Sequence, residues 1–171
     1  PRPGVGLDEN GLPDNFWSDL IEPDPFIMGN TNETDPMANS REAPQFTCRL
    51  ITEPYRISKY PITVAQYRAF IAAKGYEKPV YWTDAGWTWK EEQKIAGPKD
   101  YGEPFNLDNH PQVGVSWYEA VAFCNWLAEK TGQNISLPTE AQWERAARHI
   151  DGRRYPWSPD LAADPDPNRM N

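Results

Sequence analysis

Two glutamates four positions apart are the first residues whose spacing points to chemistry. Glu140 and Glu144 would lie on the same side of a helix, because residues at i and i+4 are neighbours on a helical surface. Such a pair of carboxylates suits general acid–base catalysis or the clamping of a metal ion. Arg145 and Arg148 follow closely, however, and the helix dipole favours a Glu near a helix start. We therefore favour ion pairing over catalysis for this pair.

Cysteine and histidine are scarce in this chain. Cys48, Cys124, His110 and His149 are too few for a zinc cage of thiolates and imidazoles. The two thiols could form a disulfide or bind a soft metal such as Cu(I), but each falls in a pattern typical of a core-facing strand or helix. We therefore expect two buried thiols. His110 could act as a base, yet nothing in the sequence places a Ser or Cys nucleophile beside it, and His149 offers no more.

Oxygen ligands gather near the end of the sequence. Carboxylate and amide oxygens suit a hard cation such as calcium, but the spacing and the glycine turn of an EF-hand are missing. We favour a solvated acidic loop over a calcium site here. The residues concerned are Asp160, Asp164, Asp166, Asn168 and Asn171.

Aromatic residues crowd the proline-rich stretch 76–111, which is too irregular for a long helix or strand. It is also too aromatic for a flexible linker, so we expect an ordered, packed loop. Exposed rings in this loop would form a binding surface, with Tyr and Trp as anchors. Packing of the same rings within the loop is the alternative. The candidates for the surface are Tyr81, Trp82, Trp87 and Trp89.

Three capping boxes predict where helices begin, because a Ser or Thr followed three residues later by Gln or Glu satisfies the first free N–H groups of a helix. The boxes are Thr63 with Gln66, Ser116 with Glu119, and Thr139 with Gln142. The first helix should stop at Gly75 and the second at Gly132. The second helix should turn one face to the core, formed by Ala120, Val121, Cys124 and Leu127.

Short strands are expected elsewhere in the chain. The run 45–51 alternates, with Phe46, Cys48 and Leu50 on one face. Another strand is plausible at 55–60, and Val113 with Val115 predicts a third. Together with the helices, these strands predict an α+β fold.

Composition limits the class of protein. A chain of 171 residues with 13% aromatic residues can bury one sizeable core, whereas 18 prolines disfavour a helical bundle. Its net charge of -8 repels phosphate backbones and anionic lipids, and it shows neither a long apolar run nor a signal peptide. We therefore expect no nucleic-acid or membrane partner and a cytoplasmic location. Residues 1–25 are expected to be a linker or surface-hugging opening segment before a domain at 26–171.

A family resemblance runs through most of the chain. Residues 111–158, PQVGVSWYEAVAFCNWLAEKTGQNISLPTEAQWERAARHIDGRRYPWS, resemble the signature of the sulfatase-modifying-factor family, the formylglycine-generating enzyme domain. Upstream, FIMGN at 26–30, EAP at 42–44 and KYPITVAQYRAFIAAKGYEKPVYWTDAGW at 59–87 follow in the family's order. The opening RPGVGL with GLPDNFW is similar to the lead-in found where this domain follows another domain in large bacterial proteins. The resemblance thus implies an upstream fused domain and a further, C-terminal part of this domain.

The resemblance also implies a C-type-lectin-like fold with short strands, about three helices at the capping boxes and long ordered loops. Calcium is often bound in this family, and an Asn that matches Asn171 helps to bind it in the enzymes. In those enzymes, a copper-binding pair of cysteines and much of the substrate groove lie after that Asn. Neither Cys48 nor Cys124 matches that pair.

Two functions of different classes follow from the resemblance. The first is a non-catalytic module that binds a protein or small ligand, as in family members without the cysteine pair, including the variable proteins of diversity-generating retroelements. The second is the N-terminal portion of a copper-dependent oxidase that converts a sulfatase cysteine to formylglycine. We favour the first, because the enzymes' own site residues are not among these 171 residues. A purely structural spacer stays open as a third interpretation.

Overall fold

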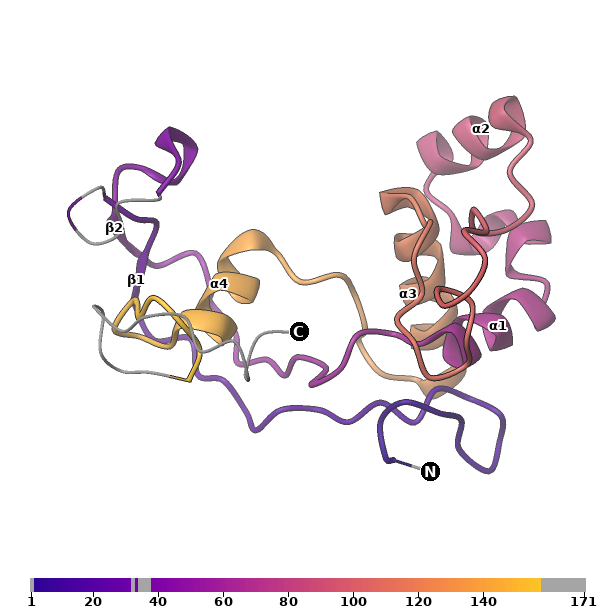
Figure 1. Cartoon of the computed structure of the whole chain (residues 1–171), viewed down its shortest axis with the longest axis horizontal. Helices are drawn as coiled ribbons and strands as arrows, with labels where there is room; N and C mark the ends of the chain where they lie inside the picture. The colour runs from indigo at the N-terminus through magenta and orange to yellow at the C-terminus, as the bar shows by residue number, and fades with distance from the viewer. Residues whose placement is uncertain (1, 32, 34–37, 158–171) are drawn as a thin grey trace. The chain divides into compact units, whose positions relative to one another are not determined.

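The computed structural model describes residues 2–31, 33 and 38–157. These residues form four α-helices, three short 3-10 helices and one two-stranded antiparallel sheet (Figure 1). The chain divides into two compact units: unit 1 comprises residues 1–17 and 58–137, and unit 2 comprises residues 18–57 and 138–171. The mixed composition of helix and strand agrees with the expected α+β class. The finer expectation of a C-type-lectin-like fold stays a prediction.

Two helices of unit 1, α1 and α3, begin where the capping boxes predicted. Before α1 (Val64–Ala72), the Thr63 hydroxyl accepts from the Gln66 N–H, and the Gln66 side chain accepts from the Thr63 N–H. Before α3 (Trp117–Thr131), Ser116 and Glu119 form the same reciprocal pair. α3 ends at Gly132, whose φ of 67° is the left-handed conformation that glycine adopts without strain. α1 ends at Ala72, three residues before the expected stop at Gly75.

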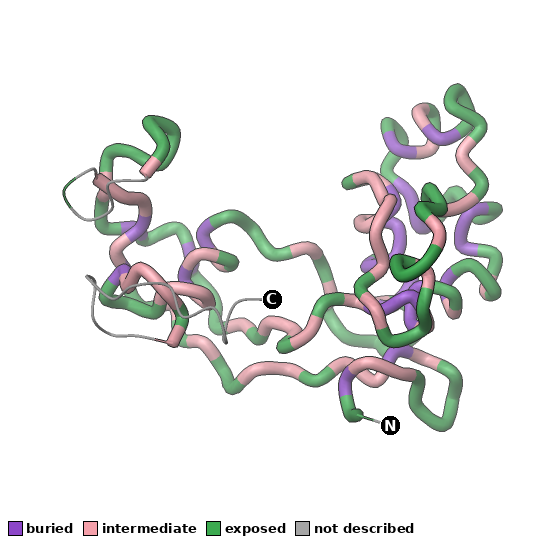
Figure 2. Tube along the Cα trace, in the orientation of Figure 1, coloured by how far each residue is buried: buried purple, intermediate pink, exposed green. Residues whose placement is uncertain are grey.

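Aromatic rings fill the core of unit 1. There α1 lies beside α3 (Figure 1), and both helices carry buried residues (Figure 2). Phe70 is fully buried, and its ring meets that of Phe123 edge-on at 5.9 Å. Tyr67 stacks on Phe123 at 5.2 Å, and Trp126 packs against the same two phenylalanines. Edge-on and stacked arrangements of this kind are favourable beyond the area they bury. The core of unit 1 is therefore built mainly from rings.

The predicted inward face of α3 is only partly right. Cys124 and Leu127 are buried as expected, but Ala120 and Val121 are only half-buried. Phe123 and Trp126 are buried instead. The face of α3 that packs on the aromatic core of unit 1 is therefore rotated relative to the face that the sequence predicted.

A hydrogen-bonded network of polar groups lies inside this aromatic core. The Tyr76 hydroxyl donates to Glu119 Oε1 at 2.6 Å and shares a 3.1 Å bond with the Tyr67 hydroxyl. The other carboxylate oxygen of Glu119 accepts from the Ser116 N–H at 2.7 Å, which completes the capping box of α3. Burial raises the pKa of both tyrosines far above the usual range. One buried carboxylate thus ties the start of α3 to two tyrosines.

The helix α2 (Asp84–Gln93) corrects the expectation of an irregular loop over 76–111. Thr83 caps this helix by accepting from the Gly86 N–H at 3.0 Å, but position 86 carries no Glu or Gln side chain to complete a box. The glycine is needed for packing, since a Cβ there would come within 2.9 Å of the Tyr118 ring. The signal was missed because a glycine in the first turn and two tryptophans two positions apart do not resemble an amphipathic helix.

Unit 2 is built on one small sheet and one helix. Strands β1 (Phe26–Met28) and β2 (Phe46–Cys48) pair antiparallel with Phe26 opposite Cys48, and α4 (Glu140–Arg148) packs against β1. The third predicted capping box, Thr139 with Gln142, starts α4. A 3-10 helix at Ser40–Glu42 lies between the strands in sequence. The small core of this unit consists of Phe26, Met28, Cys48, Ile51 and Ala141.

The predicted strands are shorter than expected or absent. The run 45–51 yields only β2, and of its expected inner face Cys48 is buried whereas Phe46 and Leu50 are 47% and 76% exposed. Residues 55–60 make single bridges, from Tyr55 to Ile21 and from Ser58 to Trp17, without a continuous ladder. Val113 and Val115 form no strand. The alternating pattern of residues predicted longer strands than the structure has. The sheet pairs three residues on each strand, and the other described residues of the predicted strands have no neighbouring strand to pair with.

The opening segment is mostly coil, as expected, yet it is bonded to α1. The Asp14 carboxylate accepts from the N–H groups of Gly4 and Gly6, and the Thr63 hydroxyl donates to the Val5 carbonyl.

In the part of the chain that the structure describes, no helix combines the length and the apolar character that a membrane crossing requires.

We predict that Tyr76→Phe destabilises the chain by about 1–3 kcal/mol, because it removes the hydroxyl that donates to the buried Glu119 Oε1 and leaves the Tyr67 hydroxyl only its bond to the Glu119 carbonyl. The measurement is urea denaturation followed by tryptophan fluorescence. Tyr101→Phe is the matched control, since Tyr101 is 55% exposed, and it should change the free energy of unfolding by less than about 0.5 kcal/mol. Equal effects of the two substitutions would show that the network contributes no stability.

Candidate functional site

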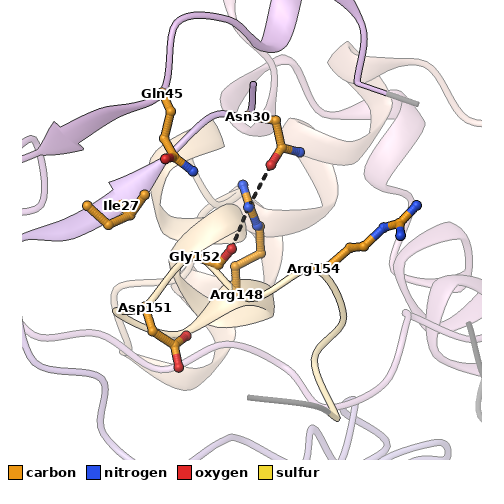
Figure 3. Close-up of a pocket in the computed structure, with 7 residues that line it drawn as sticks. All are labelled: Ile27, Asn30, Gln45, Arg148, Asp151, Gly152 and Arg154. Atoms are coloured by element: carbon orange, nitrogen blue, oxygen red, sulfur yellow. Dashed lines mark hydrogen bonds between the residues drawn. The ribbon is translucent and has the colours of Figure 1, made fainter. Parts of the chain in front are cut away.

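A small polar pocket lies between β1 and the end of α4 in unit 2. Its volume is about 90 Å³, and the side chain of Arg148 lies in the middle of it (Figure 3). The residues that line it are Ile27, Asn30, Gln45, Arg148, Asp151, Gly152 and Arg154. The sequence analysis did not identify this pocket, because its lining residues come from three separate segments of the chain.

Arg148 organises the pocket through all of its donors. Its Nη1 donates to the Gly29 carbonyl and to Glu144 Oε1, and its Nη2 donates to Asn30 Oδ1 and the Gly152 carbonyl. Its Nε donates to the Arg153 carbonyl at 2.9 Å. A guanidinium has five N–H groups, and here each has an acceptor. Arg148 therefore holds the walls of the pocket together and has no N–H left for a ligand.

Glycine is required at the edge of this pocket. Gly29 has a φ of 81°, and a Cβ on it would come within 2.5 Å of the Glu42 carbonyl oxygen. Its N–H donates to Glu144 Oε1 at 2.7 Å, and its carbonyl accepts from Arg148. The tight turn after β1 thus brings backbone groups to both members of the ion pair on α4.

The two glutamates singled out by their spacing have different roles. Glu140 is exposed in the first turn of α4, where it suits the helix dipole. Glu144 is 16% exposed in its side chain and forms an ion pair with Arg148 at 2.7 Å. The ion-pair interpretation is confirmed for Glu144, and the two carboxylates do not form one site.

The two cysteines are free and buried, as expected. Cys48 is 1% exposed in the core of unit 2, and Cys124 lies in the aromatic core of unit 1. Burial raises the pKa of the Cys124 thiol to about 11, so a metal-binding thiolate is disfavoured there. Each sulfur is packed in the apolar core of its own unit, which agrees with the expectation of two buried thiols.

The remaining predicted ligands are not brought together among the described residues. His110 contributes its backbone carbonyl as an acceptor for the Val64 N–H, and His149 is exposed at the end of α4. Residues 2–31, 33 and 38–157 contain no cluster of three His, Cys, Asp or Glu side chains that could hold a metal ion. The acidic segment with Asp160, Asp164, Asp166, Asn168 and Asn171 lies outside the described residues, so calcium binding at Asn171 stays a prediction.

The four aromatic residues predicted to form a binding surface separate into two groups. Tyr81 and Trp82 are 3% and 6% exposed in the core of unit 1, which corrects the expectation of exposure at these positions and agrees with the packing alternative. Trp87 is half-buried, with the Trp82 ring 6.3 Å away and Lys90 Nζ 4.3 Å above its own ring. Trp89 is also half-buried and packs against Tyr118 of α3.

One exposed ring and two half-buried rings form a cluster of three, which we call the aromatic surface: Trp117, with Tyr118 and Trp89. The Tyr118 ring lies 5.5 Å from each of the two tryptophans. Trp117 is 62% exposed, because it is the first residue of α3 and its side chain points away from the core. The sequence analysis did not propose Trp117 for the binding surface, because it searched the aromatic stretch 76–111 and Trp117 lies in the next predicted helix. Trp117 is not on the expected inward face of that helix, and this could have indicated that its ring is exposed.

The comparisons with known proteins agree on one family. The model of the "Sulfatase-modifying factor enzyme 1-like domain" family matches residues 18–171, which include unit 2 and all of unit 1 from Ser58 onwards. The matched residues include those that carry the resemblance described above, and they make up most of the chain.

Two enzymes with different names are among the similar proteins. The hercynine oxygenase of Mycolicibacterium thermoresistibile is 30% identical over 148 residues, which cover 78% of this chain and 31% of that protein. The formylglycine-generating enzyme of Thermomonospora curvata is 32% identical over 166 residues, which cover 80% of this chain and 50% of that protein. The formylglycine-generating enzyme of Mus musculus is 44% identical over 50 residues. The chain thus spans 31% and 50% of the length of the two bacterial relatives.

We predict that Arg148→Lys destabilises unit 2 by about 2–4 kcal/mol, because a lysine has three donors on one nitrogen and cannot reach acceptors arranged around a planar fork. Urea denaturation measures the change. The matched control is Arg49→Lys at an exposed position after β2, which should cost less than about 0.5 kcal/mol. If Arg148→Lys were as mild as the control, the pocket would not depend on the five bonds.

Proposed function

The chain belongs to the sulfatase-modifying factor enzyme 1-like domain family, and we propose that it acts as a binding part of a larger bacterial protein. In this role it holds a protein or small ligand on a formylglycine-generating-enzyme-like scaffold and does not itself carry out an oxidation. Variation of surface residues on a constant scaffold, as in the variable proteins of diversity-generating retroelements, is the form of recognition that we envisage.

The aromatic surface is the observation that carries this proposal. The exposed Trp117 packs on Tyr118, and Tyr118 in turn packs on Trp89, so the three rings offer a rigid, apolar area that costs little conformational entropy on binding. Isolated exposed apolar residues are common on proteins, whereas a contiguous exposed cluster often marks an interaction site. Trp117 is the centre of the proposed contact, with Tyr118 and Trp89 supporting it.

The location of the reactive groups supports the same proposal. Both thiols are buried in cores, Glu144 is paired with Arg148, and Glu119 accepts bonds from Tyr76 and Ser116. These side chains hold the fold together and are not available to a substrate. The surface groups of unit 1 are therefore the better candidates for recognition.

The alternative function is the N-terminal portion of a copper-dependent oxidase that forms formylglycine from a sulfatase cysteine. Its support is the similarity to relatives that are named formylglycine-generating enzymes. In that case the copper-binding sulfurs would come from sequence other than Cys48 and Cys124, since neither thiol matches the cysteine pair of the enzymes. Calcium bound with help from Asn171 is compatible with either function.

We predict that this chain alone shows no detectable oxidation of a Cys-x-Pro-x-Arg peptide in the presence of Cu(I) and oxygen, because its two thiols are buried in separate cores. Mass spectrometry of the peptide detects the loss of the thiol and the gain of an aldehyde. A Cys48→Ser, Cys124→Ala double variant should give the same result. Turnover by the unchanged chain that the double variant abolishes would replace the binding proposal with the oxidase.

We predict that Trp117→Ala lowers the affinity for peptides selected on the unchanged chain by about tenfold or more, because truncation of a central aromatic anchor typically costs over 1 kcal/mol. Phage-displayed peptides supply the ligands, and fluorescence polarisation measures Kd. The matched control is Trp143→Ala, since Trp143 of α4 is also 62% exposed but has no ring packed against it among the described residues. Peptides that tolerate both substitutions equally would contradict a role for the aromatic surface.

A further inference from the structure

Arg145 is a buried cation without a counter-charge. It lies on α4, on the side of the helix that carries Ala141, and is 8% exposed. Among the described residues it has no hydrogen-bond acceptor and no ion pair, and its Nε–H is completely enclosed without a partner. A guanidinium stays charged at any ordinary pH, so the cost of removing it from water has to be offset by an acceptor.

Arg148 shows what this unit does with a buried guanidinium when acceptors are present. Its side chain is 13% exposed, close to the burial of Arg145 three residues earlier on the same helix. Arg148 nevertheless has an acceptor for each of its five N–H groups. Arg145 is thus the more deeply buried of the two residues and has none of the partners that Arg148 has. This contrast indicates that the partner of Arg145 comes from elsewhere.

The nearby polar groups do not supply that partner. Glu144 is directed to Gly29 and Arg148, and Glu140 is exposed at the start of α4. The hydroxyl of Tyr55 donates its proton to the Gln142 carbonyl at 2.6 Å. Burial raises the pKa of Tyr55, and the charge of Arg145 acts in the opposite direction, so the phenol and the guanidinium are close enough to interact. A cationic spot beside a tyrosine thus lacks an anion.

We propose that Arg145 is a carboxylate-binding site, whose ligand comes from outside the described residues. A carboxylate accepts two parallel N–H bonds from a guanidinium, and its single negative charge neutralises the single buried positive charge. A phosphate dianion would fit less well, because it would leave an extra negative charge buried. The carboxylate belongs either to an acidic side chain of a polypeptide or to a small free acid. The site goes beyond the proposed function, because Arg145 needs an anion whether the chain is a binding part or part of an oxidase.

The first test follows the side-chain Nε–H signals of Arg145 and Arg148 by ¹⁵N NMR of the whole 171-residue chain. Sodium acetate is added against sodium chloride at equal ionic strength, and in a separate titration the peptide acetyl-Ala-Asp-Ala-amide is added. We expect a saturable shift of the Arg145 signal with at least one carboxylate, and no shift of the Arg148 signal. A response to acetate indicates a site open to a free acid, and a response to the peptide alone indicates a site for an acidic side chain.

The chain's own acidic residues are separated from external ligands by a further variant. Asp160, Asp164 and Asp166 are replaced together by Asn, and the titration with acetate is repeated. A shift that appears only in this variant shows that the chain's own carboxylate occupies the site. If the Arg145 signal responds to none of the three conditions, the proposal is overturned.

A stability test distinguishes a binding site from a structural arginine. The stability test uses the variant in which Asp160, Asp164 and Asp166 are replaced by Asn, so that none of these three carboxylates can occupy the site. Arg145→Met keeps much of the apolar stem of the side chain and removes its charge, so in this background it should raise the Tm measured in chloride. Saturating carboxylate should raise the Tm of the background variant by about 4 °C at ten times its Kd and leave Arg145→Met unaffected. Arg148→Met is the control and should lower the Tm with or without carboxylate. If Arg145→Met lowers the Tm as much as Arg148→Met does, Arg145 is a structural residue and the proposal fails.

Discussion

Unit 2 depends on one buried guanidinium. Among the described residues, its sheet has two strands of three residues and its apolar core has five buried members, which is little to fix a single arrangement of the chain. Arg148 compensates by joining three segments at once: the turn after β1, the helix α4 and the turn at Gly152 and Arg153. A fully satisfied polar network of this kind specifies geometry more precisely than a small apolar core does. The polar pocket of Figure 3 is a consequence of that network.

A buried carboxylate has the corresponding role in unit 1, and it links the fold to the proposed binding surface. Glu119 closes the capping box at Ser116 and accepts from Tyr76, so it fixes both the first turn of α3 and its contact with the aromatic core. Trp117 and Tyr118 are the first two residues of that turn. The orientation of the aromatic surface is therefore set by a carboxylate that does not belong to it.

The sequence predicted those parts of the structure that local bonds determine. All three capping boxes form, because the reciprocal bonds of Thr63, Ser116 and Thr139 involve residues only three apart. The strands and the exposure of the rings were predicted less well, since both depend on distant partners. Phe46 and Leu50 alternate correctly, but the described residues form no second sheet to cover them. Trp82 can be buried because its indole N–H reaches the Gly75 carbonyl within the core. The ion pair of Glu144 with Arg148 was predicted from its spacing, but the rest of the Arg148 network was not, because Gly29 and Asn30 are more than a hundred positions away. The unpaired Arg145 could not be predicted, because a missing acceptor leaves no pattern in the sequence.

The similar proteins carry two different enzyme names, so similarity to them does not select one reaction for this chain. The same stretch of chain is about equally similar to a hercynine oxygenase and to a formylglycine-generating enzyme, at 30% and 32% identity. Residues common to proteins with two different names cannot by themselves select either reaction, since a fold carries many functions and the site decides among them. The buried residues described above, Glu119, Glu144 and Arg148, have structural partners that suffice to explain their presence. What distinguishes this chain chemically is therefore to be sought in side chains that the fold does not need: Trp117 is 62% exposed, and Arg145 has no acceptor among the described residues.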